Sequence, residues 1–291
     1  MKDQIKAYIE SLVEAYVKEN DVRGNEKVTK KIASAAKRNA EIVKVKAITN
    51  ITDKQQDDNH TYINYDVHMQ YLIKQKEKMY VEEQLEHHIA SFYKNKLYDT
   101  REIEYEDIIL NLEKTDADFS TVREDVRISY SYDRLKAVQY AERWWNSYNP
   151  AYKKFDVDCT NFISQCLHTG GAPMRGYPNK SKGWWMRGNS WSYSWSIANS
   201  LRLYLSTSKS GLQAREVSSP DELQLGDVIC YDFQGDGRFD HNTIVTGKDA
   251  YGMPLVNAHT YNSRMRYWAY EDSSAYTPNI KYKFFTIIDN A

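Results

Sequence analysis

The distribution of proline, tryptophan and glycine divides this chain into two parts. All six prolines lie after residue 149, all seven tryptophans lie between Trp144 and Trp268, and eleven of the twelve glycines lie after residue 169. A single uniform domain would not sort its residues in this way. A chain of 291 residues is long enough for two ordinary domains. We therefore predict a boundary near residue 130, with one domain over residues 1–130 and a second over residues 131–291.

The N-terminal part carries two clear hydrophobic patterns. Apolar side chains recur with helical spacing over residues 5–17, and they alternate with polar ones over residues 63–73, which is typical of a half-buried strand. Residues 79–94 and 101–112 could be further strands, although 79–94 also fits a helix. We predict a helix packed on a small antiparallel sheet. Its histidines show no convincing spacing to carboxylates, so we expect no metal site and interpret this part as a binding, positioning or regulatory module of unknown partner.

Composition and charge exclude several classes of protein. The hydrophobic fraction is 41% and no run approaches the roughly 18 apolar residues of a membrane helix. A net charge of −1 gives no general attraction to nucleic acid. The first residues lack the apolar core and cleavage site of a signal peptide. Three cysteines are too few for a disulfide framework, so a cytoplasmic, mother-cell or cell-wall location all stay open.

The stretch DCTNFISQC, which begins at Asp158, places a cysteine at an expected helix start. One helical face is apolar and consists of Phe162, Ile163, Cys166 and Leu167. We predict Asp158 as the N-cap, with its carboxylate bonded to first-turn N–H groups. The positive end of the helix dipole would favour a thiolate at Cys159, whose outward N–H could hold an oxyanion. The alternative is that Cys159 is a small buried residue, as we expect for Cys166 and Cys230.

A histidine that could serve as the base for Cys159 lies in a predicted three-strand meander. The strands are VICYDF, HNTIVTG and PLVNAHTYN, and His241 begins the middle one. In the third strand, Asn257 and His259 share a face, and either could bond the His241 ring and fix its tautomer. Asp240 could line the site. The aspartates of DFQGDGRFD could form a calcium loop, but a tight turn that positions His241 fits the spacing better.

The segment GWWMRGNSWSYSW holds four tryptophans. Trp191 and Trp195 have the spacing of a helix that packs into a core. We expect Trp184 and Trp185 to be exposed near the cleft, where their indoles could bind the substrate.

The segments DCTNFISQ, LQLGDVICYDF, GDGRFDHNTIVTG and VNAHTYN closely resemble the putative amidase domain of Gram-positive bacteria, a relative of the NlpC-type and CHAP-type cell-wall hydrolases. The resemblance covers roughly residues 131–287. It implies a papain-like α+β fold, in which a cysteine-bearing helix packs on an antiparallel sheet. It also implies Cys159 as nucleophile and His241 as base. The third residue is His259 by the amidase-domain pattern, which we favour, or Asn257 by the NlpC alignment.

One feature of papain-like enzymes is missing from the sequence. The glutamine that donates to the oxyanion precedes the cysteine in papain, whereas NPAYKKFDVD contains none. Tyr148 or Tyr152 could take that role.

The favoured function is a cysteine amidase or peptidase that forms a thioester acyl-enzyme and needs no metal or cofactor. Its substrate would be peptidoglycan or a related peptide-like wall or spore material. Two alternatives stay open. One is an inactive structural protein that binds cell wall or coat. The other is an acyl-transferase that uses the same cysteine and histidine to make cross-links.

Overall fold

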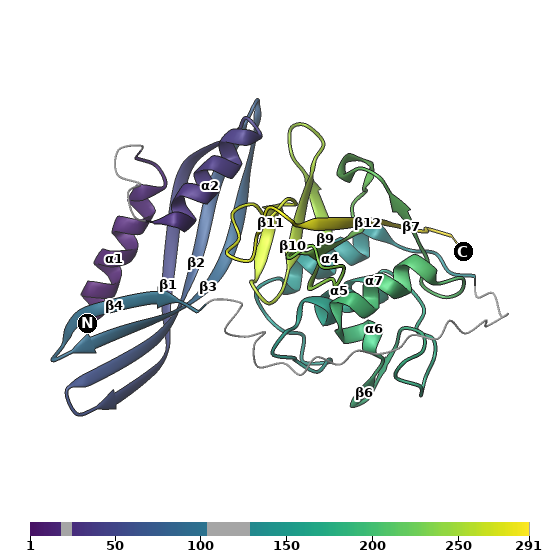
Figure 1. Cartoon of the computed structure of the whole chain (residues 1–291), viewed down its shortest axis with the longest axis horizontal. Helices are drawn as coiled ribbons and strands as arrows, with labels where there is room; N and C mark the ends of the chain where they lie inside the picture. The colour runs from purple at the N-terminus through teal and green to yellow at the C-terminus, as the bar shows by residue number, and fades with distance from the viewer. Residues whose placement is uncertain (19–24, 104–128, 291) are drawn as a thin grey trace. The chain divides into compact units, whose positions relative to one another are not determined.

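The computed structural model describes residues 1–18, 25–103 and 129–290, and it divides into two compact units (Figure 1). The first unit comprises the described residues up to 103 together with Tyr261–Ser263 and Ala269–Ser274. The remaining described residues form the second unit. Both contain helices and strands, so the α+β class is confirmed. The predicted boundary near residue 130 adjoins residues 104–128, which lie outside the described part of the chain.

In the first unit, two helices pack on one face of an antiparallel meander with the order β1-β2-β3-β4 (Figure 1). The elements are α1 (Lys2–Ala15), α2 (Glu26–Lys37), β1 (Glu41–Asp57), β2 (His60–Gln75), β3 (Lys78–Tyr93) and β4 (Lys96–Glu102). The predicted helix and the strand over 63–73 are confirmed as α1 and β2. Residues 79–94 form a strand, not a helix. Of the expected strand over 101–112, residues 104–112 lie outside the described residues.

The core of the first unit follows directly from the alternation along β2. Six residues of one face are at most 2% exposed, namely Ile63, Tyr65, Val67, Met69, Tyr71 and Ile73. From α1, Ile5, Ile9 and Leu12 pack into the same cluster. Because successive strand side chains point to opposite faces, this single face supplies most of the apolar surface that the helices cover.

Two short segments from the C-terminal half also belong to this unit. The backbone N–H of Leu85 donates to the carbonyl of Asn262 at 2.8 Å. The Lys31 ammonium on α2 lies 2.9 Å from the Asp272 carboxylate, and both side chains are almost fully buried. The N-terminal unit is therefore completed by residues distant in sequence.

The second unit is built on a sheet with the strand order β11-β10-β9-β8-β12-β7. Its strands are β7 (Ala214–Val217), β8 (Val228–Asp232), β9 (His241–Lys248), β10 (Pro254–Ala258), β11 (Ser263–Tyr267, whose first residue groups with the first unit) and β12 (Lys281–Ile287). A two-stranded piece pairs β5 (Met186–Arg187) with β6 (Ser190–Trp191). The predicted meander of β8, β9 and β10 is confirmed, with both pairings antiparallel.

Helix α5 (Cys159–Thr169) lies at the centre of this unit and is buried from Cys159 to Leu167. The other helices are α4 (Arg134–Trp144), α6 (Tyr193–Ser196), α7 (Ala198–Thr207) and the 3-10 turn η1 (Pro220–Glu222). The predicted apolar face of α5 packs against Val228, Cys230 and Ile244 of β8 and β9. A cysteine-bearing helix on an antiparallel sheet is thus present.

The motif Leu225-Gly226-Asp227, directly before β8, joins α4 to β8 and β12. The Asp227 carboxylate is fully buried and lies 2.6 Å from the Arg134 guanidinium. It also accepts the backbone N–H groups of Gln224 at 2.7 Å and Ile287 at 2.9 Å. Arg134 bonds a second carboxylate, Asp289, which is about half exposed.

These two carboxylates give a matched stability test. We expect Asp227→Ala to lower the free energy of unfolding by about 2–4 kcal/mol. The change leaves two buried N–H groups and a partly buried guanidinium without their acceptor. Asp289→Ala should cost about 0–1 kcal/mol, since that carboxylate faces water. Urea unfolding followed by tryptophan fluorescence measures both. Equal losses would show that burial does not set the strength of these pairs.

Candidate active site

Cys159 is the first residue of α5, as predicted, but Asp158 does not cap the helix with its side chain. The Asp158 Oδ1 atom accepts the backbone N–H of Phe155 at 3.0 Å and the Asn161 amide at 2.9 Å. Its other oxygen bonds His259. The N-cap role predicted for the Asp158 carboxylate is therefore wrong, because these partners use both of its oxygens.

The hydroxyl of Thr260 takes over the capping of α5. Its Oγ1 accepts the N–H groups of Asp158 and Cys159, each at 3.1 Å. Thr260 has a φ of 81°, a left-handed conformation that is uncommon for a β-branched residue. The Cys159 N–H, which we expected to be available for an oxyanion, is thus engaged within the protein.

The thiol of Cys159 is almost fully enclosed, with 1% of the residue exposed. Burial raises its pKa, and hydrogen bonds from Thr160 and from the backbone N–H of Asn242 oppose the rise only in part. The Thr160 hydroxyl lies 3.7 Å from the sulfur. In this conformation Cys159 is consequently a neutral thiol at neutral pH.

His259, which directly precedes Thr260, is the histidine held beside Asp158. Its Nδ1 lies 2.8 Å from Asp158 Oδ2, and its Nε2 lies 2.7 Å from the Trp144 carbonyl oxygen. Both partners are acceptors, so both bonds form together only when each ring nitrogen carries a hydrogen. The ring stacks on Phe162 at 4.0 Å between centroids. Phe162 lies one helical turn after Cys159, which places His259 on the same side of α5 as the thiol.

The amide of Asn257 is used elsewhere. Its Oδ1 accepts the Thr246 hydroxyl at 2.7 Å and the Met265 N–H at 2.9 Å, and its Nδ2 donates to Glu142 at 2.8 Å. Asn257 thereby ties β10 to β9, β11 and α4, which is a structural role.

The side chain of His241 lies on the face of the sheet opposite α5. Cys230 pairs with Asn242, whose amide reaches Thr160 on α5 at 3.1 Å, whereas Tyr231 pairs with His241. Because neighbouring strand residues face opposite ways, His241 points away from the helix. Its ring accordingly lies 5.7 Å from that of Tyr231. The structure thus brings together Asp158, Cys159 and His259, and it does not bring His241 to the α5 face.

Burial also limits what His241 can do. Desolvation, with a smaller contribution from Arg266, lowers the pKa of His241 to about 3. The ring is neutral at neutral pH and is a weak proton acceptor. Nearby Asp240 accepts the N–H of Phe233 at 3.3 Å, and burial raises its pKa to about 6. The Asp232 carboxylate accepts the N–H groups of Gly235 at 2.7 Å and Gly237 at 2.8 Å, which gives the tight turn that the spacing favoured.

The expected exposure of two tryptophans is wrong. Trp184 and Trp185 are 0% and 1% exposed. The Trp184 indole donates to the Ser164 hydroxyl at 2.9 Å, and the Trp185 indole donates to the carbonyls of Asn179 and Lys182, each at 3.1 Å. Neither ring can stack on a substrate in this conformation. Trp195 is fully buried, as are Cys166 and Cys230, in agreement with the core roles expected for them.

The two tyrosines suggested as oxyanion donors line a small hollow of about 10 Å³ beside Asp158 and His259. Tyr148 makes an edge contact with the His259 ring at 5.0 Å, and Tyr152 stacks on Trp195 at 6.1 Å. Lys153 and Lys154 also line this hollow and are exposed.

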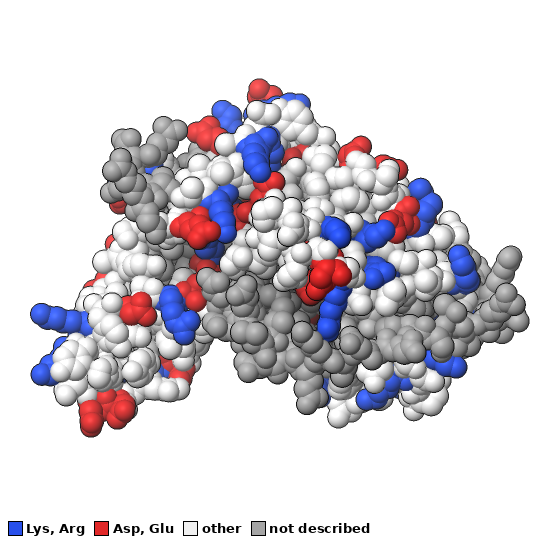
Figure 2. Space-filling model, in the orientation of Figure 1, with Lys and Arg blue, Asp and Glu red and all other residues white. Residues whose placement is uncertain are grey.

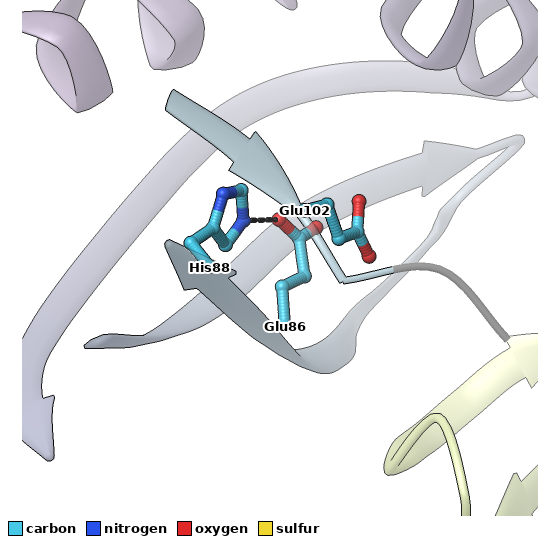
Figure 3. Close-up of side chains that lie close together, drawn as sticks. All are labelled: Glu86, His88 and Glu102. Atoms are coloured by element: carbon cyan, nitrogen blue, oxygen red, sulfur yellow. Dashed lines mark hydrogen bonds and ion pairs between the residues drawn. The ribbon is translucent and has the colours of Figure 1, made fainter. Parts of the chain in front are cut away.

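The first unit contains a group of potential metal ligands that the sequence did not reveal. Glu86, His88 and Glu102 lie close together, with His88 bonded to Glu86 at 2.9 Å (Figure 3). However, the Lys27 ammonium lies 2.7 Å from Glu86 and 2.5 Å from Glu102. Burial alone would raise the pKa of Glu86, but Lys27 and His88 outweigh it and lower that pKa to about 2. We interpret the group as a buried ion-pair network, since a metal would have to displace Lys27.

The described residues on one face of the molecule show no area where basic side chains alone gather. Figure 2 shows acidic and basic side chains interspersed over the face in view. Among the described residues, no helix combines the length and apolar character needed to cross a membrane.

Comparison with known proteins identifies the family. Residues 131–285 match the putative amidase domain, and the chain belongs to this family. It is 52% identical over 259 residues to the uncharacterised protein YhbB of Bacillus subtilis, covering 87% of this chain and 83% of that relative. It is also 32% identical over 126 residues to the uncharacterised protein YjcM of the same organism, covering 40% of this chain and 28% of YjcM. No solved structure matches the chain.

Thr260 offers a test of the capped helix end. We expect Thr260→Ala to lower the free energy of unfolding by about 1 kcal/mol, because two N–H groups lose their acceptor. The same change should speed alkylation of Cys159 by iodoacetamide, read by mass spectrometry. Thr260→Ser should behave like wild type, and Thr207→Ala, which removes a hydroxyl from an exposed helix, is the control. Unchanged alkylation in Thr260→Ala would show that the bond from the Cys159 N–H to Thr260 does not limit the reaction of the thiol.

The buried His241 predicts a pH dependence. Its pKa falls from 6.5 to about 3 on folding, so only the unfolded chain takes up the proton between these values. The stability it contributes is present above pH ~6.5 and is lost as the pH falls, by up to about 1.4 kcal/mol per pH unit. We expect His241→Gln to flatten the fall in unfolding free energy between pH ~6.5 and ~5. If the slope of unfolding free energy against pH is the same in His241→Gln as in wild type, the lowered pKa of His241 is not its cause.

Proposed function

We propose that this member of the putative amidase domain family is a cysteine-dependent amide hydrolase, with Cys159 as the nucleophile and His259 as its proton-transfer partner. The observation that carries the proposal is the Asp158–His259 bond of 2.8 Å at the start of α5, directly beside Cys159. An imidazole oriented by a carboxylate next to a cysteine at a helix N-terminus is an arrangement that activates thiols. Choosing His259 over His241 follows from the opposite faces that the two rings occupy.

The reaction would follow the acyl-enzyme route. The Cys159 sulfur attacks the amide carbonyl carbon, and its proton passes to His259. The carbon–nitrogen bond then breaks, and the amine leaves with that proton. Water attacks the resulting thioester and releases the carboxylic acid and the free thiol. No cofactor enters these steps.

His259 can take this part only after a local rearrangement. Its Nε2 is bonded to the Trp144 carbonyl at 2.7 Å. That bond has to open, and Nε2 has to give up its hydrogen, before the nitrogen can accept the thiol proton. Asp158 would meanwhile hold the Nδ1–H and so fix the reactive tautomer. The Thr260 hydroxyl has to leave the Cys159 N–H as well, so that a carbonyl oxygen can bind there.

For the substrate we propose a peptide amide of peptidoglycan or a related wall or spore polymer. The support is the likeness to cell-wall hydrolases, together with Lys153 and Lys154 beside the His259 hollow. Two exposed ammonium groups suit a peptide that carries free carboxylates, which attract them at low ionic strength.

A second candidate is a wall-binding protein without catalysis. It is favoured by one observation, namely that Cys159 is 1% exposed and its thiol pKa is raised. Such a protein would bind wall material equally well after Cys159→Ala.

The test is amine release from purified Gram-positive peptidoglycan by the full chain. We expect Cys159→Ala to abolish release and Cys166→Ala, a buried cysteine on the same helix, to retain it. His259→Gln should lose about 10²–10⁴-fold, the usual contribution of a general base. His241→Gln should keep activity within a few-fold at neutral pH.

Other outcomes would redirect the assignment. Full activity in Cys159→Ala would exclude a cysteine mechanism. Loss in His241→Gln with retention in His259→Gln would return the base to His241. New isopeptide bonds without free amine would indicate acyl transfer.

A further inference from the structure

Asn242, the second residue of β9, has an unpaired buried amide oxygen. The residue is fully buried, and its Nδ2 donates to the Thr160 hydroxyl at 3.1 Å. Within the described part of the chain, its Oδ1 has no hydrogen-bond partner. Leaving a buried acceptor unpaired costs about 1–3 kcal/mol, and most buried side-chain polar atoms are paired. The exception calls for a reason.

The other buried amides around α5 lack this defect. Asn161 accepts the Trp195 indole N–H at 2.8 Å and donates to Lys153 and Asp158, each at 2.9 Å. Asn257 is satisfied at both ends. Asn242 therefore differs from two amides in the same polar environment.

The unpaired amide lies at the nucleophile. The backbone of Asn242 lies near enough to the Cys159 thiol to lower its pKa, against the larger effect of burial. The side chain of Asn242 bonds Thr160, the next residue of α5, whose hydroxyl is 3.7 Å from the Cys159 sulfur. A group that binds to Cys159 would thus meet Asn242 within the first turn of the helix.

We propose that Asn242 Oδ1 is a substrate-recognition group, which accepts the N–H of the amide that lies against Cys159. The inference rests on the proposed function only in that Cys159 attacks amides. The N–H of a secondary amide would complete the bonding of Asn242, whereas an N,N-dialkylated amide would leave the oxygen unpaired. The site would then distinguish amides that carry an N–H from amides that do not. An amide without an N–H is strongly disfavoured, because it leaves a buried polar atom of the site unpaired.

The test compares two alkylating probes that do not depend on hydrolysis. Iodoacetamide carries amide N–H groups, and N,N-dimethyl-iodoacetamide does not. Their rates at Cys159 are measured site by site by mass spectrometry and divided by their rates with N-acetylcysteine. Any opening of the site affects both reagents, so it cancels in the ratio. Wild type should prefer iodoacetamide by about two- to ten-fold, the effect of one hydrogen bond. Asn242→Leu, of similar shape, should bring the ratio to about one.

A stability comparison separates recognition from a structural role. Asn242→Leu should lower the melting temperature less than Asn161→Leu does, since it removes one unpaired oxygen and only one hydrogen bond, from Nδ2 to Thr160. Asn161→Leu should lower it, because three satisfied bonds are lost. Equal probe ratios in wild type and Asn242→Leu, or a melting temperature that falls as far in Asn242→Leu as in Asn161→Leu, would overturn the inference. Amide hydrolysis that survives Cys159→Ala would instead overturn the proposed function, whatever the ratio.

Discussion

The rest of the second unit depends on how the end of β10 holds the N-terminus of α5. A helix start leaves N–H groups without partners inside the helix, and here that start is buried. The Thr260 hydroxyl accepts two of these groups, and the His259 ring bonds the carboxylate of Asp158. This dipeptide therefore caps the start of α5 through Thr260 and binds the residue before Cys159 through His259.

The burial of this helix start also raises the pKa of the Cys159 thiol. Enclosure removes water from Cys159, and the loss of solvation outweighs the nearby donors, so the pKa of the thiol rises. The helix end cannot offset this, because Thr260 already occupies its N–H groups. The left-handed backbone of Thr260 indicates that packing holds this segment against its local preference. The contacts that stabilise this segment thus oppose the reactivity proposed for Cys159, and the proposed catalysis would require the segment to move.

The sequence could predict the elements that bury one repeating set of side chains. The alternation of β2 and the apolar face of α5 were both readable, because burial follows the period of the element. The strand β1 was missed, since only Ile42 and Val45 of its 17 residues are buried and no alternation results. The burial of Trp184 was equally hidden, because its partner Ser164 lies on a different element. The capping by Thr260 depends on a contact between residues about one hundred positions apart, for which the local pattern has no signal.

The pair His241 and Asn242 shows where sequence reasoning about the site reaches its limit. The strand start at His241 was predictable, but its face was not, because a shift of one residue exchanges the two sides of a strand. In the structure the imidazole, which is the more versatile chemical group, points away from α5 and is kept neutral by burial. The amide points toward α5 and has an oxygen without a partner. The sequence argument chose His241 for its chemistry, whereas the side chain that faces α5 is that of Asn242. Side-chain direction, together with an unpaired polar atom that folding alone would not favour, is the ground for proposing Asn242 as the residue of this pair that belongs to the site.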